Sequence, residues 1–245
     1  MDASCAVRAP PRRAVVTWQR TKALVVASAT SRDIFTAGND IKELHAPSTS
    51  EARFRRFWRA QTGCLVAYLR SPLPVAAAIG GACPAGGCAL ALCCERRVML
   101  DSGNKATIGL NEVALGIAVP AHWGCRMAAV IGERRAEEML TGGAMLPPKE
   151  AAAVGLVDAL AGDEETLLRA AHNWAARAAK AAPQARARTK LALPGREAAA
   201  AAWWAQVDEE AAASWAMLSD KRVSGALGAV LQRLSSGGKK AAGKL

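Results

Sequence analysis

The chain has 245 residues, of which 51% are hydrophobic, and a formal net charge of +11. This length and apolar content allow one large domain with a substantial core, and no apolar run reaches the roughly 18 to 20 residues that span a bilayer. The charge suits nucleic acid, an anionic membrane surface or a phosphorylated small molecule, but one Tyr and three Phe, even with seven Trp, make a base-stacking surface improbable.

The seven cysteines fit a reducing compartment, because their number is odd and their spacing matches no zinc pattern. We therefore expect neither structural disulfides nor a bound metal. Residues 1–20 contain four arginines and one acidic residue without an apolar core, which disfavours a secretory signal and is similar to a mitochondrial transit peptide. The final Gly-Lys-Leu differs by one residue from the Ser-Lys-Leu peroxisomal signal. The mitochondrial matrix and the peroxisome both remain open.

The first third of the chain predicts a buried strand at residues 23–28, a turn at 30–33 and a second extended segment over 34–40. A helix is predicted over residues 51–69 because large apolar side chains recur there at helical spacing. The members of this stripe are Phe54, Phe57, Trp58, Leu65, Tyr68 and Leu69.

A glycine-rich stretch at residues 79–94 is the main feature of the sequence. Residues 74–79 predict a buried strand, and four glycines and a proline then precede a small, apolar helix that starts near Gly86. The free N–H groups and dipole at such a helix start can hold a phosphate or a developing oxyanion. Close packing of the helix on the strand would select the same glycines, so both interpretations remain.

The rest of the chain predicts further strand–turn–helix units. Strands are expected at 97–100, 106–108 and 156–160, and helices at 120–130, at 134–140 and from Pro148 to Gly155. From residue 164 onward the chain is Ala-rich and predicted helical, with breaks at Pro183 and Pro194-Gly195. One long helix there has an apolar face that we expect to pack on a core or another subunit: Trp203, Trp204, Val207, Ala211, Trp215 and Leu218.

Three segments together resemble the crotonase (enoyl-CoA hydratase/isomerase) superfamily. They are Phe-Thr-Ala-Gly-Asn-Asp at 35–40, Ala-Cys-Pro-Ala-Gly-Gly-Cys at 82–88 and Leu-Asn-Glu-Val-Ala-Leu-Gly-Ile at 110–117. The second and third are similar to the mitochondrial-type enoyl-CoA delta isomerase branch in particular. The resemblance covers roughly residues 23–233.

This resemblance implies an α/β fold, a spiral of repeated strand-strand-helix units followed by a C-terminal helical trimerisation region. The expected divisions are a short N-terminal segment at 1–22, a spiral core at 23–178, a helical region at 179–234 and a disordered tail at 235–245. The family's first hairpin and helix are expected to be missing, because only the short segment precedes Ala23. The resemblance also implies a homotrimer or a dimer of trimers.

The resemblance further implies that the backbone N–H groups of Asn39 and Gly86 hold a thioester oxygen, and that Glu112 transfers the proton. The Asn39 side chain is expected to matter less than its backbone. The residues around Glu112 support its role independently, because Leu110, Val113 and Leu115 would bury the carboxyl group and raise its pKa. A surface or helix-start Glu is the alternative.

Acyl-CoA is the implied substrate, with no separate cofactor, since coenzyme A is part of the substrate. The implied binding residues are Ala37, Gly38, Asp40, Ile41, Ala85, Gly87, Leu110 and Ile117. Ala37 and Ile41 would flank the adenine. Lys42, Arg188 and Lys190 are possible phosphate neighbours or simply solvated. Binding of the coenzyme A phosphates would explain the positive net charge without nucleic acid or membrane insertion.

Hydratases of the superfamily need a second Glu, and the matching position here is Ala89. Glu95 is expected to lie at the surface or in an ion pair, and Cys83 and Cys88 in the core. His45 and His122 are expected to be ordinary, partly exposed residues. The sequence therefore predicts an isomerase that converts 3-enoyl-CoA into 2-trans-enoyl-CoA. The alternatives are hydration, thioester hydrolysis, and a non-catalytic acyl-CoA-binding protein.

Overall fold

The fold was analysed in a computed structural model that describes residues 21–29, 34–101, 103 and 106–242, with side chains through residue 233. The sequence predictions for residues 1–20, including the absence of the family's first hairpin and helix, lie outside these described residues.

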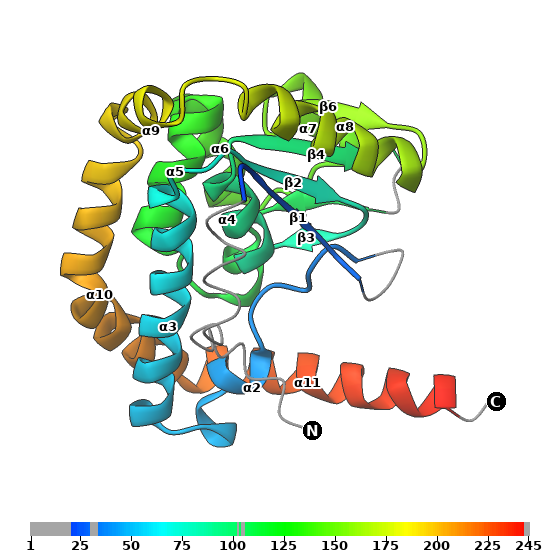
Figure 1. Ribbon diagram of the computed structural model, residues 1–245. Helices are drawn as coiled ribbons and strands as arrows, with labels where there is room; N and C mark the ends of the chain where they lie inside the picture. Colours follow the sequence, from blue (N-terminus) through cyan, green and yellow to red (C-terminus); the bar gives the residue numbers. More distant parts are fainter. Residues whose placement is uncertain (1–20, 30–33, 102, 104–105, 243–245) are drawn as a thin grey trace.

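Four parallel strands form the larger sheet, in the order β1 (Leu24–Ala27), β2 (Val75–Ile79), β4 (Arg96–Leu100) and β6 (Ala159–Ala161). Strand β2 lies between two neighbours and is buried at every residue, which explains its uniform Val-Ala-Ala-Ala-Ile sequence. Helix α8 (Glu164–Ala178) packs against this sheet through Leu167 and Ala171 (Figure 1).

A second, shorter layer follows the same order along the chain. Strand β3 (Cys83–Pro84) pairs in parallel with β5 (Ile108–Gly109), and single bridges join Ile34 to Ala82 and Ile108 to Leu146. Successive turns of the chain thus add one strand to the larger sheet and a short segment to the second layer. This arrangement confirms the predicted α/β spiral of strand-strand-helix units.

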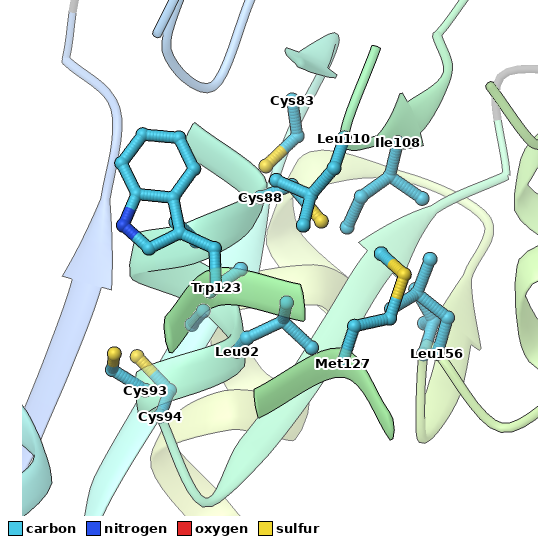
Figure 2. Packing of buried hydrophobic residues seen from close by; sticks show 14 of the residues in the cluster. Cys83, Cys88, Leu92, Cys93, Cys94, Ile108, Leu110, Trp123, Met127 and Leu156 are labelled. Carbon is cyan, nitrogen blue, oxygen red and sulfur yellow. The ribbon is translucent and has the colours of Figure 1, made fainter. Parts of the chain in front are cut away.

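The main core lies between the sheets and the helices α3 (Glu51–Arg70), α4 (Gly86–Cys93) and α5 (Ala121–Ile131). Figure 2 shows Leu92, Trp123 and Met127 meeting here, together with the buried cysteines Cys83 and Cys88. Both cysteines are fully buried, as expected from their apolar surroundings, and burial raises the pKa of each thiol. They are therefore packing residues.

Short helices connect these elements. They are α2 (Ile41–Leu44), the 3-10 turns η1 (Ala46–Ser48) and η2 (Glu112–Leu115), α6 (Glu133–Gly142) and α7 (Pro148–Ala153). The predicted strand at 156–160 begins only at Ala159. Leu156 and Val157 bond elsewhere, because the carbonyl of Leu156 accepts from the Arg97 side chain and the Val157 amide donates to the carbonyl of Ala151 in α7.

Three helices form the C-terminal region: α9 (Pro183–Ala192), α10 (Glu197–Leu218) and α11 (Lys221–Ala242). Helix α10 lies along α3, and a second core forms where Phe54 and Trp58 of α3 meet Val207 and Leu218 of α10 (Figure 1). The predicted apolar face of α3 is confirmed, and that of α10 is confirmed except at Trp204, which is 46% exposed. No helix in the described ranges is long and apolar enough to cross a bilayer.

The end of α11 differs from the prediction of a disordered tail at 235–245. The helix includes residues 235–242 and continues through Gly237 and Gly238, although glycine disfavours helix. Residues 243–245 lie outside the described part of the chain.

Substitution of Leu92 by Ala tests the packing of α4. Leu92 is fully buried between the strands and α5, so loss of its side chain leaves a cavity and lowers the free energy of unfolding by about 2 to 5 kcal/mol. Leu168→Ala on α8, where Leu168 is 40% exposed, is the matched control and changes it by about 0.5 kcal/mol. Urea unfolding of both variants measures the difference, and equal losses would contradict this account of the core.

Candidate active site

Two sharp backbone turns form the centre of the candidate site. The first, residues 36–40, turns at Gly38, whose φ of +85° favours glycine. The second precedes α4, where Ala85 has φ +53° and ψ −124° and is the one non-glycine residue with positive φ in the described ranges. Such strained conformations persist where the surrounding structure enforces them and often occur at functional sites.

Close packing of the two turns brings Asn39 next to Gly86. A methyl group on Gly38 would lie 3.2 Å from the Pro84 carbonyl oxygen and 3.4 Å from the Gly86 nitrogen. Upstream, the amide of Phe35 donates to the Ala82 carbonyl at 3.0 Å, which ties the two segments together. The two backbone amides predicted to hold an oxyanion are therefore neighbours in space.

Neither of these amides has an acceptor within the part of the chain that the structure describes. Helix α4 starts at Gly86 without a side-chain cap, and no hydrogen bond within the described part of the chain uses the N–H of Asn39 or Gly86. Unsatisfied N–H groups at a helix start are anion-binding groups, and the helix dipole adds positive potential. The arrangement can accept an oxygen atom on which negative charge develops.

An apolar cavity of about 260 Å³ lies beside the two turns and contains Asn39, Ala85 and Glu112 in its lining. Its other walls come from α2, α3, α5, η2, α10 and α11. The residues that form these walls include Leu44, Trp58, Leu115, Trp123, Met217, Leu218, Leu227 and Val230. Glu112 is the single carboxylate among the described residues that line this cavity.

Glu112 begins the 3-10 turn η2 and is only 8% exposed. Its Oε2 atom is buried without a hydrogen-bond partner among the described residues. Burial raises the pKa of this carboxyl group from 4.5 to about 7, against a smaller lowering by its own backbone N–H. A group with this pKa can both take up and release a proton near neutral pH. The burial and the raised pKa of Glu112 were both predicted from its apolar neighbours.

A second cavity, of about 540 Å³, shares Asn39 with the first and is more polar. Gly38, Asp40, Gln61 and Gly86 line it, together with Arg53 and Arg56 of α3. Glu43 also lies in its wall and forms an ion pair with Arg53. Asn39 is thus at the junction of an apolar and a polar cavity.

The structure gathers most of the predicted binding residues around these cavities. Ala37, Ile41, Ala85 and Ile117 line the apolar one, and Gly38, Asp40 and Gly86 the polar one. Two residues are exceptions and line neither cavity. Leu110 is a core residue with 1% exposure, and Gly87 packs on Thr36, whose Cγ2 would lie 2.5 Å from a methyl group there.

Lys190 and His122 are more deeply buried than predicted. Lys190 is buried, because its Nζ pairs with Glu95 at 2.7 Å and donates to the Leu73 carbonyl at 3.0 Å, so it is no phosphate neighbour. His122 is 7% exposed rather than partly exposed, since α10 covers it and its Nδ1 lies 2.8 Å from Oε1 of Glu210. Lys42 and Arg188 are exposed, and His45 is half-buried.

No second carboxylate takes the place of the hydratase Glu in the described site. Ala89 is 2% exposed within α4 and lines neither cavity. Glu95 is an ion-pairing residue, as expected, and binds Arg186 and Lys190 of α9. No group of three or more metal-ligating side chains occurs among the described residues.

Sequence reasoning did not identify the cavity walls or the polar contact of Asn39. Met217, Leu218 and Leu227 belong to helices whose apolar faces were visible in the sequence, but no local pattern showed that these faces enclose Glu112. The Nε2 of Gln61 donates to Oδ1 of Asn39, a contact across 22 positions that no spacing rule predicts.

The described site combines two sharp turns, two free amides and a buried carboxyl group, as expected for a crotonase-type site. Residues 15–221 match the enoyl-CoA hydratase/isomerase family, so the chain belongs to this family.

Several of the relatives that it matches are enoyl-CoA delta isomerases or subunits of fatty acid oxidation complexes. Enoyl-CoA delta isomerase 1, mitochondrial, from Rattus norvegicus is 38% identical over 141 residues, 58% of this chain and 48% of that protein; the Homo sapiens protein is 37% identical over 155 residues, 62% and 50% respectively. The chain thus spans about half the length of these curated relatives.

A solved structure gives a longer match. Human mitochondrial delta3-delta2-enoyl-CoA isomerase superposes with a TM-score of 0.82 at 30% identity, covering 91% of this chain and 86% of that one. The enoyl-CoA hydratase from Bacillus halodurans, with a TM-score of 0.73 at 23% identity and coverage of 84% and 81%, supports the fold alone.

The raised pKa of Glu112 predicts a pH dependence of stability. Between pH 4.5 and about 7 the unfolded chain releases the proton that the folded protein retains, so the free energy of unfolding falls as pH rises through this window. Glu112→Gln stays neutral in both states, and at pH 8 it exceeds the parent in stability by up to roughly 3 kcal/mol. Urea unfolding at pH 5 and pH 8 measures this, and equal pH slopes for the two proteins would contradict it.

Proposed function

We propose that the protein is an enoyl-CoA delta isomerase, which moves the double bond of a 3-enoyl-CoA to the 2-trans position. The observation that carries this proposal is the single buried carboxylate, Glu112, in a cavity shared with Asn39 and Ala85. The named relatives support the same reaction.

In the proposed mechanism, the ionised Glu112 removes a proton from carbon 2 of the acyl chain. The electrons of that C–H bond move toward the thioester carbonyl and give a dienolate, whose oxygen accepts hydrogen bonds from the N–H groups of Asn39 and Gly86. Glu112 then returns the proton to carbon 4, and the double bond forms between carbons 2 and 3. One acid–base group suffices because the dienolate is delocalised over both carbons.

Hydration is the disfavoured alternative. It requires both activation of a water molecule and protonation of the acyl chain, and these steps need a second acid or base. Ala89 supplies none, and both carboxylate oxygens of Glu95 are engaged by Arg186 and Lys190. A non-catalytic acyl-CoA-binding protein would bind the thioester without moving a proton, and the test below distinguishes it.

The chemistry of the cavities supports acyl-CoA as the substrate class. Apolar side chains of α10 and α11 suit a hydrocarbon chain, and the exposed Lys42 remains available near the Ala37–Ile41 segment for a phosphate group. We propose that no further cofactor takes part, since the proton transfer needs only Glu112 and the two amides.

We also propose a homotrimer or a dimer of trimers, with the exposed side chains of Leu193 and Trp204, 55% and 46% accessible, as candidates for the subunit contact. The mitochondrial names of the isomerase relatives favour the mitochondrial matrix over the peroxisome, and the fatty acid oxidation complex subunits among the relatives favour a role in the oxidation of unsaturated fatty acids.

Turnover of 3-hexenoyl-CoA tests the proposed reaction. We expect formation of the conjugated 2-enoyl product, with kcat rising as pH increases through about 7, because only the ionised Glu112 can accept the proton. Glu112→Gln lowers kcat by about 10²- to 10⁴-fold, whereas Glu165→Gln on the exposed face of α8 leaves it unchanged. Full activity of Glu112→Gln would refute the mechanism, and coenzyme A binding without turnover in the parent would favour the non-catalytic alternative.

A further inference from the structure

The side chain of Asn39 lies against the start of α4, where an uncommitted amide oxygen would interfere with the proposed oxyanion site. A methyl group on Gly86 would lie 2.6 Å from Oδ1 and 3.2 Å from Cγ of Asn39. The first N–H groups of α4 have no side-chain cap. An Asn side-chain oxygen is among the acceptors that most readily cap a helix start.

Gln61 engages this oxygen instead. Its Nε2 donates to Oδ1 of Asn39, and the same Nε2 would lie 3.4 Å from a methyl group on Gly86. Gln61 belongs to the 20-residue helix α3, which Trp58 and Leu65 fix in the two cores with exposures of 4% each. The Nε2 donor therefore belongs to a side chain whose helix is fixed by packing in both cores.

We propose that Gln61 is a positioning residue that binds the Asn39 side chain and thereby prevents it from capping α4, which leaves the Gly86 amide free for the thioester oxygen. This inference rests on the proposed isomerase function and extends it to two side chains, those of Gln61 and Asn39, that take no part in the proposed proton transfer. It agrees with the expectation that the Asn39 side chain matters less than its backbone, and it gives the side chain a reason to be held away from α4.

The physical basis is a competition for one acceptor. Without Gln61, the Asn39 amide can rotate, and its oxygen gains a hydrogen bond by accepting from the start of α4. That bond would satisfy the donor that the dienolate requires, and loss of one oxyanion donor lowers kcat by about 10²- to 10³-fold. Removal of Asn39's oxygen in the same protein would free the donor again.

The test is a double-mutant cycle with kcat and KM for 3-hexenoyl-CoA. Gln61→Ala is expected to lower kcat by about 10- to 100-fold, with KM changed by less than about threefold, because the lost donor acts mainly on the charged state. Asn39→Ala is expected to lower kcat by about threefold, since the turn loses its tie to α3. The double variant should resemble Asn39→Ala, so the second substitution restores activity to Gln61→Ala.

The control is Gln206→Ala, an exposed glutamine on α10, which should retain the parent kcat and KM. A loss of packing alone would make the double variant at least as impaired as Gln61→Ala. That result, or full activity of Gln61→Ala, would overturn the proposal.

Amide hydrogen exchange at Gly86 gives a readout that does not depend on turnover. The Gly86 N–H should be protected in Gln61→Ala and exchange faster in both the parent and the double variant. If the parent fails to isomerise 3-hexenoyl-CoA, the proposed function fails, but this exchange pattern still supports the role of Gln61. Equal exchange in all variants would overturn that role.

Discussion

The carbonyl groups at the C-terminal end of α4 have hydrogen-bond partners, whereas the Gly86 N–H at its N-terminal end has none within the described part of the chain. The candidate site depends on this difference. At the C-terminal end three guanidinium groups donate to consecutive carbonyls: Arg126 to Leu92 at 2.9 Å, Arg196 to Cys93 at 2.9 Å and Arg97 to Cys94 at 3.1 Å. These side chains come from α5, β4 and the segment before α10, so they fix the helix from three directions. The free Gly86 amide at the other end is thereby held in place without a cap of its own.

The free amide and the buried carboxyl group that suit the site to proton transfer also lower the free energy of unfolding. A free helix-start amide lacks a hydrogen bond, and a buried carboxyl group without a partner for Oε2 is desolvated. Both lie at the edge of large apolar cores, where Trp58, Trp123 and Leu218 supply compensating burial. In the proposed reaction, a thioester carbonyl would accept hydrogen bonds from the two amides. Glu112 would remain without a partner, and its pKa would stay near neutral pH.

Local patterns were sufficient to predict most of the strands and helices and the burial of Glu112. The stripe over residues 51–69 predicted α3, and the glycine-rich stretch correctly placed the start of α4 at Gly86. The misplaced residues share a different property, since their surroundings come from distant parts of the chain. Lys190 meets Glu95 across 95 positions and His122 meets Glu210 across 88, and neither contact leaves a periodic signal.

Long-range packing also brings the C-terminal helices α10 and α11 to the cavity that contains Glu112. Val223 of α11 lies 3.7 Å from the position of a methyl group on Gly116, the residue that ends η2. Met217 and Leu227 extend this cover along the cavity that contains Glu112. Because burial is the main cause of the raised pKa of Glu112, α10 and α11 help set the pH at which this group exchanges its proton. The C-terminal region therefore lines the candidate site as well as completing the scaffold, and we expect substitutions in its apolar face to change the pKa of Glu112.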